Sequence, residues 1–436
     1  MKFYNRTNEL DEMELIRQQS EERSQMTFVI GRRRIGKTKL ILEATKNRPV
    51  VYFFTARKAE PLLCRDFTEE IAATLNIPFV GEVSNFSVLF KMLIQYSQNH
   101  PFNLIIDEFQ EFWNINPSVY SDMQNIWDQY KDVSHLNLIL SGSIYSLMHK
   151  IFENNKEPLY GRANHKFLLQ PFPPSVLKEI MTDYHPKYTN EDLLALYAFT
   201  GGVPKYVELL MDNKAFTYRK MIDFMIRENS IFINEGKNIL IEEFGKEYTR
   251  YFSILSCIAA GFTTRSQIES YLQQEIGGYL TRLEGDFDLI GKKTPLFSKS
   301  LTKNVHYNIK DHFLRFWFRF VYKYQRFIES GAIEQLKELI DRDYPTYSGI
   351  VLERYFFDKF KETHTYTTLG SYWDKKGENE IDLIALDELN RKALVAEIKR
   401  QKNKINLSVL QRKGTILQKP LADYQLSFAG LTLEDM

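Results

Sequence analysis

The sequence predicts an α/β fold in which a parallel sheet comes first, a helical middle follows and a second α/β unit ends the chain. Three observations predict it. Short apolar runs alternate with amphipathic stretches over residues 26–142. Residues 172–240 repeat apolar side chains with helical periodicity, and beyond about residue 345 a helix precedes two strand-like runs. Buried strands separated by helical segments are typical of parallel sheets.

The elements predicted for residues 26–142 are short buried strands with helical segments between them. "MTFVIG" is predicted to be a strand, and "KTKLILEATK" is predicted to be the helix after it. "PVVYFFTA", "FNLIIDEF" and "LNLILSGS" are predicted to be three further buried strands. Between 248 and 310, three helical runs precede a strand pair. That order favours a winged helix, with a generic helical lid as the alternative, because periodicity does not separate the two.

The later elements include an aromatic helix. "HFLRFWFRFVYKYQRF" repeats its rings too densely for one helical face, which predicts a helix buried on several sides. "GIVLERYFFDKF" predicts a further helix. "TTLGSYWDKKGENEIDLIALDE" and "KALVAEIKRQ" predict a hairpin of strands, and a last helix is expected near "NLSVLQRKGTILQK".

The composition limits the classes of protein to which this chain can belong. The chain has 436 residues, enough for roughly three domains, and a net charge of +1, so any basic surface must be local. The two cysteines, Cys64 and Cys257, are too few for a disulfide framework and have no CxxC spacing. The start lacks the apolar core of a signal peptide, and no apolar run approaches a membrane span. A cytoplasmic protein with no membrane partner is expected.

A phosphate-binding loop follows the first strand. Gly31, Gly36, Lys37 and Thr38 fit the pattern G-x-x-x-x-G-K-[ST] between a strand and a helix. The glycines let backbone N–H groups curl around phosphate oxygens, Lys37 can reach the β- and γ-phosphates, and the Thr38 hydroxyl can bind Mg²⁺. The side chains of Arg32 to Arg34 are expected to point outward. The residues expected at the nucleotide are Gly31, Arg34, Ile35, Gly36, Lys37, Thr38 and Lys39.

Two acids end the strand "NLIIDEF". Asp107 and Glu108 are expected at the carboxyl edge of the sheet, where ligands of parallel sheets bind. Asp107 can hold Mg²⁺ through water, and Glu108 can polarise the attacking water. Ser141 ends another strand and is expected either to sense the γ-phosphate or to form a turn. Arg162, in a loop, is either a surface arginine or a group that stabilises charge on the transferred phosphoryl group, in cis or in trans.

These motifs together resemble a known family. "FYNR", "GRRRIGKT", "LIIDEF", "LSGS", "LYGR" and "TGGVPKY" are similar to the prokaryotic ATPases related to STAND and AAA+ NTPases, often called archaeal ATPases, over roughly residues 1–240. The resemblance implies a P-loop NTPase fold that binds ATP and Mg²⁺. It also implies that the segment from Phe3 to Arg6 lies beside the adenine and that Arg162 is the arginine finger or sensor. A trans role for Arg162 would require a homo-oligomer.

The resemblance extends to the helical middle of the chain. It implies that "GGVP", with Gly202 and Pro204, faces the nucleotide from a helical lid. A winged helix commonly follows the lid in this family, in agreement with the three helical runs and strand pair of residues 248–310.

A second chemistry is expected near the end of the chain. Asp382 lies in one predicted strand, and Glu397 and Lys399 share one face of the next. If the strands pair as a hairpin, Asp382 and Glu397 can bind Mg²⁺ together and Lys399 can orient a water and offset phosphate charge. Glu353 on the preceding helix could complete the acid cluster. An exposed charged hairpin is the alternative.

This pattern resembles the PD-(D/E)xK nucleases of the restriction-endonuclease-like fold, with "ID" in place of "PD", over about residues 345–420. A basic cluster nearby suits a nucleic-acid backbone, and a solvated surface is the alternative reading. The members of the cluster are Lys375, Lys376, Arg391, Lys392, Lys399, Arg400, Lys402, Lys404, Arg412 and Lys413.

The expected organisation therefore has four parts. The boundaries are 1–171 for a P-loop ATPase core, 172–240 for a helical lid, 241–330 for a winged helix and aromatic helix, and 331–436 for a nuclease-like domain. The expected function is Mg²⁺-dependent ATP hydrolysis coupled to DNA binding or cleavage. One alternative is an ATP-controlled signalling or scaffold switch whose last domain is inactive. Another is a regulator that binds operator DNA through its winged helix, although "TTRSQIESYL" carries few clustered basic residues.

Overall fold

The computed structural model describes residues 1–46, 48–79, 81–298, 304–374 and 379–436. The chain divides into two compact units, one formed by Asn5–Gln170 and the other by Met1–Tyr4 with Pro171–Met436. In the described part of the chain, no helix combines the length and the apolar character needed to cross a bilayer.

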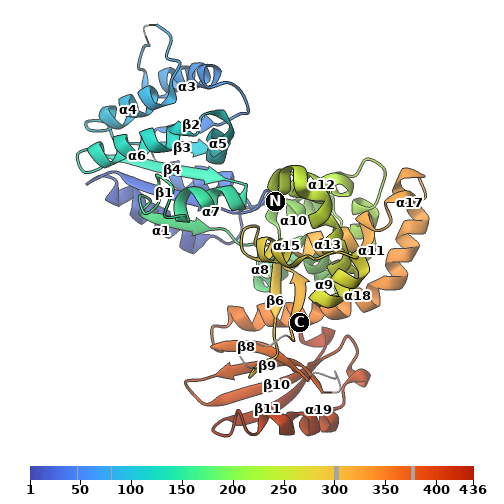
Figure 1. The fold of residues 1–436 in the computed structure, drawn as a ribbon. Helices are drawn as coiled ribbons and strands as arrows, with labels where there is room; N and C mark the ends of the chain where they lie inside the picture. The colour runs from blue at the N-terminus through green and yellow to red at the C-terminus, as the bar shows by residue number, and fades with distance from the viewer. Residues whose placement is uncertain (47, 80, 299–303, 375–378) are drawn as a thin grey trace. The chain divides into compact units, whose positions relative to one another are not determined.

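The Asn5–Gln170 unit is built on a parallel sheet with the strand order β2-β3-β4-β1-β5 (Figure 1). Every neighbouring pair of strands in it runs parallel. The elements are α1 (Thr7–Gln19), β1 (Gln25–Ile30), α2 (Lys37–Thr45), β2 (Val50–Phe54), α3 (Glu60–Leu75), α4 (Phe86–Tyr96), β3 (Phe102–Asp107), α5 (Phe112–Ile115), α6 (Ser118–Tyr130), β4 (Leu136–Gly142), α7 (Tyr145–Glu153) and β5 (His165–Leu168).

Both faces of this sheet are buried, since strand side chains alternate between two separate cores. Phe28 and Ile30 of β1 point to the core formed with α3, α4, α6 and α7, while Val29 points to the core formed with α1 and α2. Burial on both faces explains why β1, β3 and β4 are nearly continuous apolar runs. The predicted parallel α/β sheet is confirmed.

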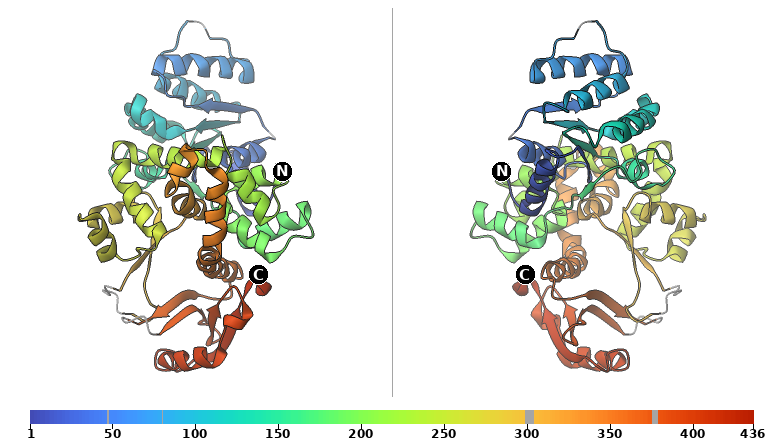
Figure 2. Two further views of the ribbon diagram at one scale, coloured as in Figure 1. Left: turned by 90° about the vertical axis from the view of Figure 1, so that its right-hand side faces the viewer. Right: turned by 90° about the vertical axis from the view of Figure 1, so that its left-hand side faces the viewer.

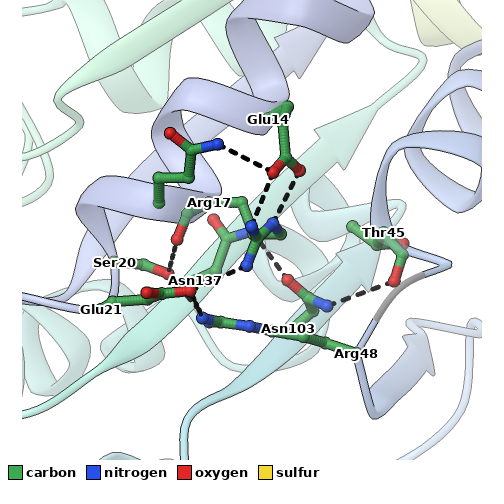
Figure 3. Close-up of polar contacts among 9 residues, drawn as sticks. Glu14, Arg17, Ser20, Glu21, Thr45, Arg48, Asn103 and Asn137 are labelled. Atoms are coloured by element: carbon green, nitrogen blue, oxygen red, sulfur yellow. Dashed lines mark hydrogen bonds and ion pairs between the residues drawn. The ribbon is translucent and has the colours of Figure 1, made fainter.

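A polar network holds the amino edge of the sheet (Figure 3). The guanidinium of Arg17, on α1, donates two hydrogen bonds of 2.6 Å to Glu14 and one of 3.0 Å to Glu21. Arg48, beyond α2, also pairs with Glu21. At the starts of β3 and β4, the buried Asn103 and Asn137 form a side-chain hydrogen bond of 2.8 Å. These contacts join the end of α1 to the segment after α2, and β3 to β4, on the side opposite the phosphate-binding loop.

The second unit has helices α8 to α12 first. The three helices α13 to α15 follow, and then the two-stranded antiparallel sheet β6–β7 (Figures 1 and 2). Its elements to this point are α8 (Pro174–Tyr184), α9 (Asn190–Thr200), α10 (Pro204–Asp212), α11 (Tyr218–Met225), α12 (Ile231–Phe244), α13 (Tyr248–Ala260), α14 (Arg265–Leu272), α15 (Gly277–Glu284), β6 (Ile290–Lys293) and β7 (His306–Ile309).

The aromatic stretch forms α16 (His312–Phe316), which continues as a π-helix over Trp317–Tyr322. Its rings lie in the main core of this unit, so the predicted burial on several sides is confirmed. The short α17 (Gln325–Glu329) comes next. The predicted helix "GIVLERYFFDKF" is the second half of a longer helix, α18 (Ile333–Glu362), which continues through Pro345.

A mixed sheet with the order β11-β10-β9-β8 closes the chain. The β9–β10 hairpin is antiparallel as predicted, and β11, which the sequence pattern did not predict, pairs parallel with β10. The elements are β8 (Thr368–Trp373), β9 (Glu380–Asp387), β10 (Lys392–Ile398), α19 (Leu407–Gly414) and β11 (Gln425–Leu431). Leu383, Ala396 and Ile398 share one core with the helices of this unit, so this sheet packs against them.

Candidate functional site

The phosphate-binding loop joins β1 to α2. A Cβ atom on Gly31 would lie 2.8 Å from the Ile35 side chain, so the turn accepts only glycine there. Gly36 has a φ of 89° and caps α2 in a left-handed conformation. The ammonium of Lys37 is buried inside the curl and donates to the Gly31 carbonyl at 2.8 Å. The loop thus has the geometry expected of a phosphate cradle at a helix N-terminus.

Asp107 lies at the carboxyl edge of the sheet, at the end of β3, next to this loop. Its Oδ2 accepts from the Thr38 hydroxyl at 2.9 Å and from the Tyr52 hydroxyl at 2.6 Å. Its Oδ1 accepts from the Ser141 hydroxyl and from the Glu108 N–H. Burial raises the pKa of Asp107, but these hydrogen bonds outweigh it and leave the pKa below its usual range. Asp107 is therefore a fixed, ionised carboxylate.

The structure places Thr38 and Asp107 together, as predicted, and adds Tyr52, which the motif analysis did not identify. Tyr52 lies on β2, 55 residues from Asp107 in the chain. The β2–β3 register pairs Tyr52 with Ile105, two residues before Asp107, which puts both side chains on one face of the sheet. Only the strand order and this register could have revealed the contact. The Ser141 hydroxyl contacts Asp107, and its predicted role as a γ-phosphate sensor or turn residue stays a prediction.

Glu108 follows Asp107 in a left-handed conformation with a φ of 53°. Its carboxylate accepts from the Ser143 hydroxyl at 2.7 Å and from the Gln110 side-chain amide at 2.5 Å. Non-glycine residues in this conformation are uncommon and are often found at functional sites. The neighbouring strands thus orient Glu108 beside Asp107, at the same edge as the phosphate loop.

Arg162 lies at the opposite edge of the sheet. Two residues beyond it, the N–H of Asn164 bonds the carbonyl of Met26 at the start of β1. The guanidinium of Arg162 pairs with Asp128 at 3.2 Å and, with Trp127 and Lys131, lines a cavity of about 320 Å³. The six residues of β1 separate this edge from the loop by about 20 Å. In this structure Arg162 therefore lies away from the phosphate loop of its own chain, and its role in cis or in trans stays a prediction.

The remaining residues that were expected near the nucleotide belong to two units. Arg6 lies in the sheet unit, where its guanidinium donates to Glu9 at 2.9 Å and to the Gln170 carbonyl. Phe3, Gly202 and Pro204 belong to the other unit. The pair Gly201–Gly202 also has a packing role, since a Cβ on Gly202 would lie 2.2 Å from the Phe172 carbonyl oxygen. The nucleotide-facing roles of these residues stay predictions.

The C-terminal candidates converge at one end of the β9–β10 hairpin. The paired residues of β9 and β10 end at Ala396 opposite Leu383, and Glu397 and Asp382 come next on the two strands. The Lys399 ammonium donates to Asp382 Oδ2 at 2.9 Å and lies 3.9 Å from Glu397 Oε1. Asp382 Oδ2 also accepts from the Ile398 N–H at 2.8 Å. The hairpin therefore brings the three predicted side chains together.

Glu353, on α18, faces this group. Burial, as the largest cause, and the charge of Asp382 raise its pKa to about 7, although the positive charges of Lys293 and Lys399 act against the rise. The pKa of Lys399 lies above its usual value, because its ion pair with Asp382 outweighs burial. A half-buried carboxyl group of pKa about 7 beside a second acid is a feature found at catalytic and metal sites, as well as in structural ion networks.

The phosphate-loop site and the C-terminal hairpin each offer oxygen donors that could hold a divalent cation. Thr38 and Asp107 offer a hydroxyl and a carboxylate in direct contact, the oxygen donors that Mg²⁺ takes. Asp382 and Glu397 offer two carboxylates, one 2.9 Å and the other 3.9 Å from the Lys399 ammonium. Over the described ranges of the chain, no group of three or more His, Cys, Asp and Glu side chains is arranged to hold a metal ion.

The predicted basic cluster is partly engaged in ion pairs. Arg400 grips Glu191 of α9 at 2.6 Å and bonds Ser348, so it holds the sheet to the helices and is removed from the nucleic-acid surface that the sequence predicted. Arg391 stacks on Tyr424. Lys375 and Lys376 lie outside the described residues. Exposed positive side chains are found at Lys392, Lys402, Lys404 and Arg412.

Comparisons with known proteins agree with the fold and the first site. Residues 3–210 match a family described as an ATPase domain predominantly from Archaea, and residues 317–411 match one described as archaeal and bacterial proteins of unknown function. "Uncharacterized protein MJECL04" of Methanocaldococcus jannaschii is 30% identical over 381 residues, which cover 85% of this chain and 82% of that protein.

Two solved structures show the same fold at low sequence identity. The Walker-type ATPase PABY2304 of Pyrococcus abyssi superposes with a TM-score of 0.55 at 19% identity, covering 73% of this chain and 96% of that one. The ORC2 protein of Aeropyrum pernix, solved as ADPNP and ADP complexes, gives 0.50 at 14% identity, covering 76% and 95%. Residues 3–210 therefore form an archaeal-type ATPase domain, in agreement with the phosphate-loop geometry and the parallel sheet, and the chain as a whole belongs to one family with MJECL04.

Proposed function

We propose that this ATPase uses its nucleotide state to control a nuclease-like site that acts on nucleic acid. The observation that carries the proposal is the Asp382–Glu397–Lys399 group at one end of the β9–β10 hairpin. The order α18, β8, β9, β10, α19, β11 agrees with the restriction-endonuclease-like fold that the sequence resembles. Two sites suited to phosphate chemistry then lie in one chain.

At the first site, the roles of the residues follow from their contacts. Lys37 would exchange its bond to the Gly31 carbonyl for the β- and γ-phosphates of ATP. Thr38 and Asp107 would hold Mg²⁺, which when bound neutralises charge on the phosphates. Glu108, oriented by Ser143 and Gln110, would accept hydrogen bonds from the attacking water and align it with the γ-phosphate.

The other expected roles belong to residues of both units. Phe3 and Arg6 would flank the adenine, while Gly202 and Pro204 would approach the nucleotide from the helical lid. The three helices and the β6–β7 pair have the order of a winged helix, which supports that assignment. Arg162, at the edge far from its own loop, would act in trans in a homo-oligomer.

At the second site, Asp382 and Glu397 would hold a divalent cation, which supplies Lewis-acid activation of a phosphodiester. Lys399 would help to orient the attacking water and offset phosphate charge. Glu353, with its raised pKa, could accept a proton near neutral pH. DNA is the substrate that the resemblance favours.

The test is a plasmid-nicking and oligonucleotide-cleavage assay in Mg²⁺ and in Mn²⁺, with and without ATP. Lys37→Ala is expected to abolish ATP turnover. Asp382→Asn and Lys399→Met are expected to keep ATP turnover and remove cleavage. Cleavage that survives both C-terminal substitutions would contradict the nuclease assignment.

The second candidate is an ATP-controlled switch whose C-terminal domain binds but does not cut. One observation favours it: the Lys399 ammonium already neutralises Asp382, and in the described segments the nearby acids do not form a three-ligand group. Nucleic-acid binding or protein assembly that depends on ATP, without strand cleavage in either metal, is the result that this candidate predicts.

A further inference from the structure

The β6–β7 pair packs on the edge of the C-terminal sheet. Beyond β6, the N–H of Leu296 donates to the Ser371 carbonyl of edge strand β8 at 2.8 Å. Before β7, the Asn304 side chain accepts from the Trp373 indole N–H at 3.0 Å. A Cβ on Gly370 would lie 2.3 Å from Leu296, so the backbones approach closely. Figures 1 and 2 show β6 and β7 reaching this edge.

This contact carries Lys293, the last residue of β6, to the acidic group. Its ammonium lies 5.6 Å from the centre of the Phe357 ring and 5.8 Å from that of Trp373. Phe357 is one turn after Glu353 on α18, so Lys293 lies over the face of the helix that presents Glu353. The two rings hold the lysine stem by packing and by cation–π attraction.

The ammonium of Lys293 differs from those of the nearby lysines, each of which pairs with a carboxylate. Lys292 pairs with Glu284, Lys310 with Asp288 and Lys399 with Asp382. For Lys293, no carboxylate of the described chain lies within ion-pair distance. Its positive charge nevertheless acts on Glu353, where it opposes the rise in pKa that burial and Asp382 cause. A held but unneutralised cation beside an acidic site is suited to an anionic ligand.

We propose that Lys293 binds a phosphate of a nucleic-acid strand held at the Asp382–Glu397–Lys399 site, so that the β6–β7 pair forms part of the substrate surface. The inference rests on the proposed function, because it assumes that a nucleic acid occupies that site. Lys399 and Lys293 would supply positive charge from two different elements. One lysine would neutralise phosphate charge beside the acids, and the other would fix the adjoining backbone.

The test measures binding of fluorescein-labelled single- and double-stranded DNA by anisotropy, with Ca²⁺ in place of Mg²⁺, over a series of salt concentrations. Lys293→Met is expected to weaken binding by about three- to tenfold and to reduce the salt slope by about one. Lys293→Arg should retain most of the affinity. Lys292→Met is the matched control, since the charge of Lys292 is already neutralised by Glu284, and it should bind as the unaltered chain does.

Lys293→Gln keeps a polar stem and replaces Lys293→Met if the latter melts at a lower temperature. If Lys399→Met weakens binding while Lys293→Met and Lys293→Gln do not, the inference about Lys293 is overturned and the proposed function stands. If the unaltered chain binds neither DNA, both are overturned. Equal losses for Lys292→Met and Lys293→Met would also overturn the inference, because they would indicate general charge attraction.

Discussion

At the scale of single residues, Tyr52 has a role that can be tested. Its hydroxyl donates to the Asp107 oxygen that also accepts from Thr38. We expect Tyr52→Phe to slow ATP hydrolysis by about ten- to 150-fold and to raise the Mg²⁺ concentration that gives half the maximal rate, because a hydrogen bond to a charged group contributes roughly 1.5–3 kcal/mol and each 1.4 kcal/mol is about tenfold in rate. Steady-state ATPase rates measured over a Mg²⁺ titration check this.

The matched control for Tyr52 is Tyr130→Phe. The Tyr130 hydroxyl accepts a hydrogen bond from Gln95 at 2.8 Å, at the far end of α6 and away from the loop. That variant should keep both the rate and the Mg²⁺ dependence. An unchanged Mg²⁺ dependence in Tyr52→Phe would show that its hydroxyl does not hold Asp107 for the reaction.

Glu353 gives a prediction about pH. Its pKa in the folded chain is about 7, raised chiefly by burial, whereas an unfolded glutamate titrates near 4.5. The folded state therefore binds the proton more tightly, and stability falls as pH rises from about 5 to 8. We expect Glu353→Gln to raise the free energy of unfolding by about 2–3 kcal/mol at pH 8 and to change it little at pH 5.

Thermal denaturation at the two pH values measures this effect. Glu338→Gln, at an exposed position of the same helix, is the control and should be neutral at both. A Glu353→Gln variant that is destabilised at pH 8 would mean that the ionised carboxylate is well satisfied in the folded chain. Such a result would remove Glu353 as a proton acceptor near neutral pH.

At the scale of elements, the π-helix depends on one close approach. A Cβ on Gly236 of α12 would lie 2.3 Å from Trp317 Cδ2, and the Trp317 indole donates to the Ile233 carbonyl at 2.8 Å. We expect Gly236→Ala to destabilise the second unit by about 2–3 kcal/mol, since overpacking a dense core forces side chains off their rotamers. The shift in the melting temperature of this unit is the readout.

Gly349→Ala is the control for Gly236→Ala, and its expected effect on stability has the opposite sign. Gly349 lies inside α18, and a Cβ there would meet nothing within 4 Å. Alanine favours a helix interior over glycine by about 1 kcal/mol, so this variant should be slightly stabilised. If both variants shift the melting temperature equally, the close approach between α12 and the π-helix does not govern the stability of the unit.

The elements that sequence patterns predicted are those with long apolar runs or a complete motif. β1 to β4 and the phosphate loop are of this kind. β5 and β11 were not predicted, because "HKFL" is only four residues long and "QLSFAGL" mixes polar with apolar residues and is half-exposed. The first half of α18 was missed because Gly331 and Pro345 resemble breaks. The hairpin motif predicted Asp382, Glu397 and Lys399, whereas Tyr52 and Lys293 depend on strand order and on packing between distant segments.

At the scale of the whole molecule, the chain passes between its two units twice, after Tyr4 and after Gln170. Within the sheet unit, the Arg6 guanidinium donates a hydrogen bond to the Gln170 carbonyl, so the first and last residues of this unit are held together. Each unit has its own core, and the two cores of the sheet unit hold no residue of the other. Such units can respond separately to a ligand that binds only one of them.

We therefore expect calorimetry to resolve two unfolding transitions, of which ATP with Mg²⁺ raises one. A ligand that binds only the folded state stabilises it by about 2.7 kcal/mol at a hundredfold excess over Kd. The nucleotide should act on the Asn5–Gln170 transition in the unaltered chain and on neither transition in Lys37→Ala. Gly236→Ala identifies the other transition by lowering it. If nucleotide raises both transitions together in the unaltered chain, nucleotide binding itself couples the units and the expectation of separate responses is wrong. A shift of the first transition alone leaves hydrolysis as the step through which ATP would control the C-terminal site.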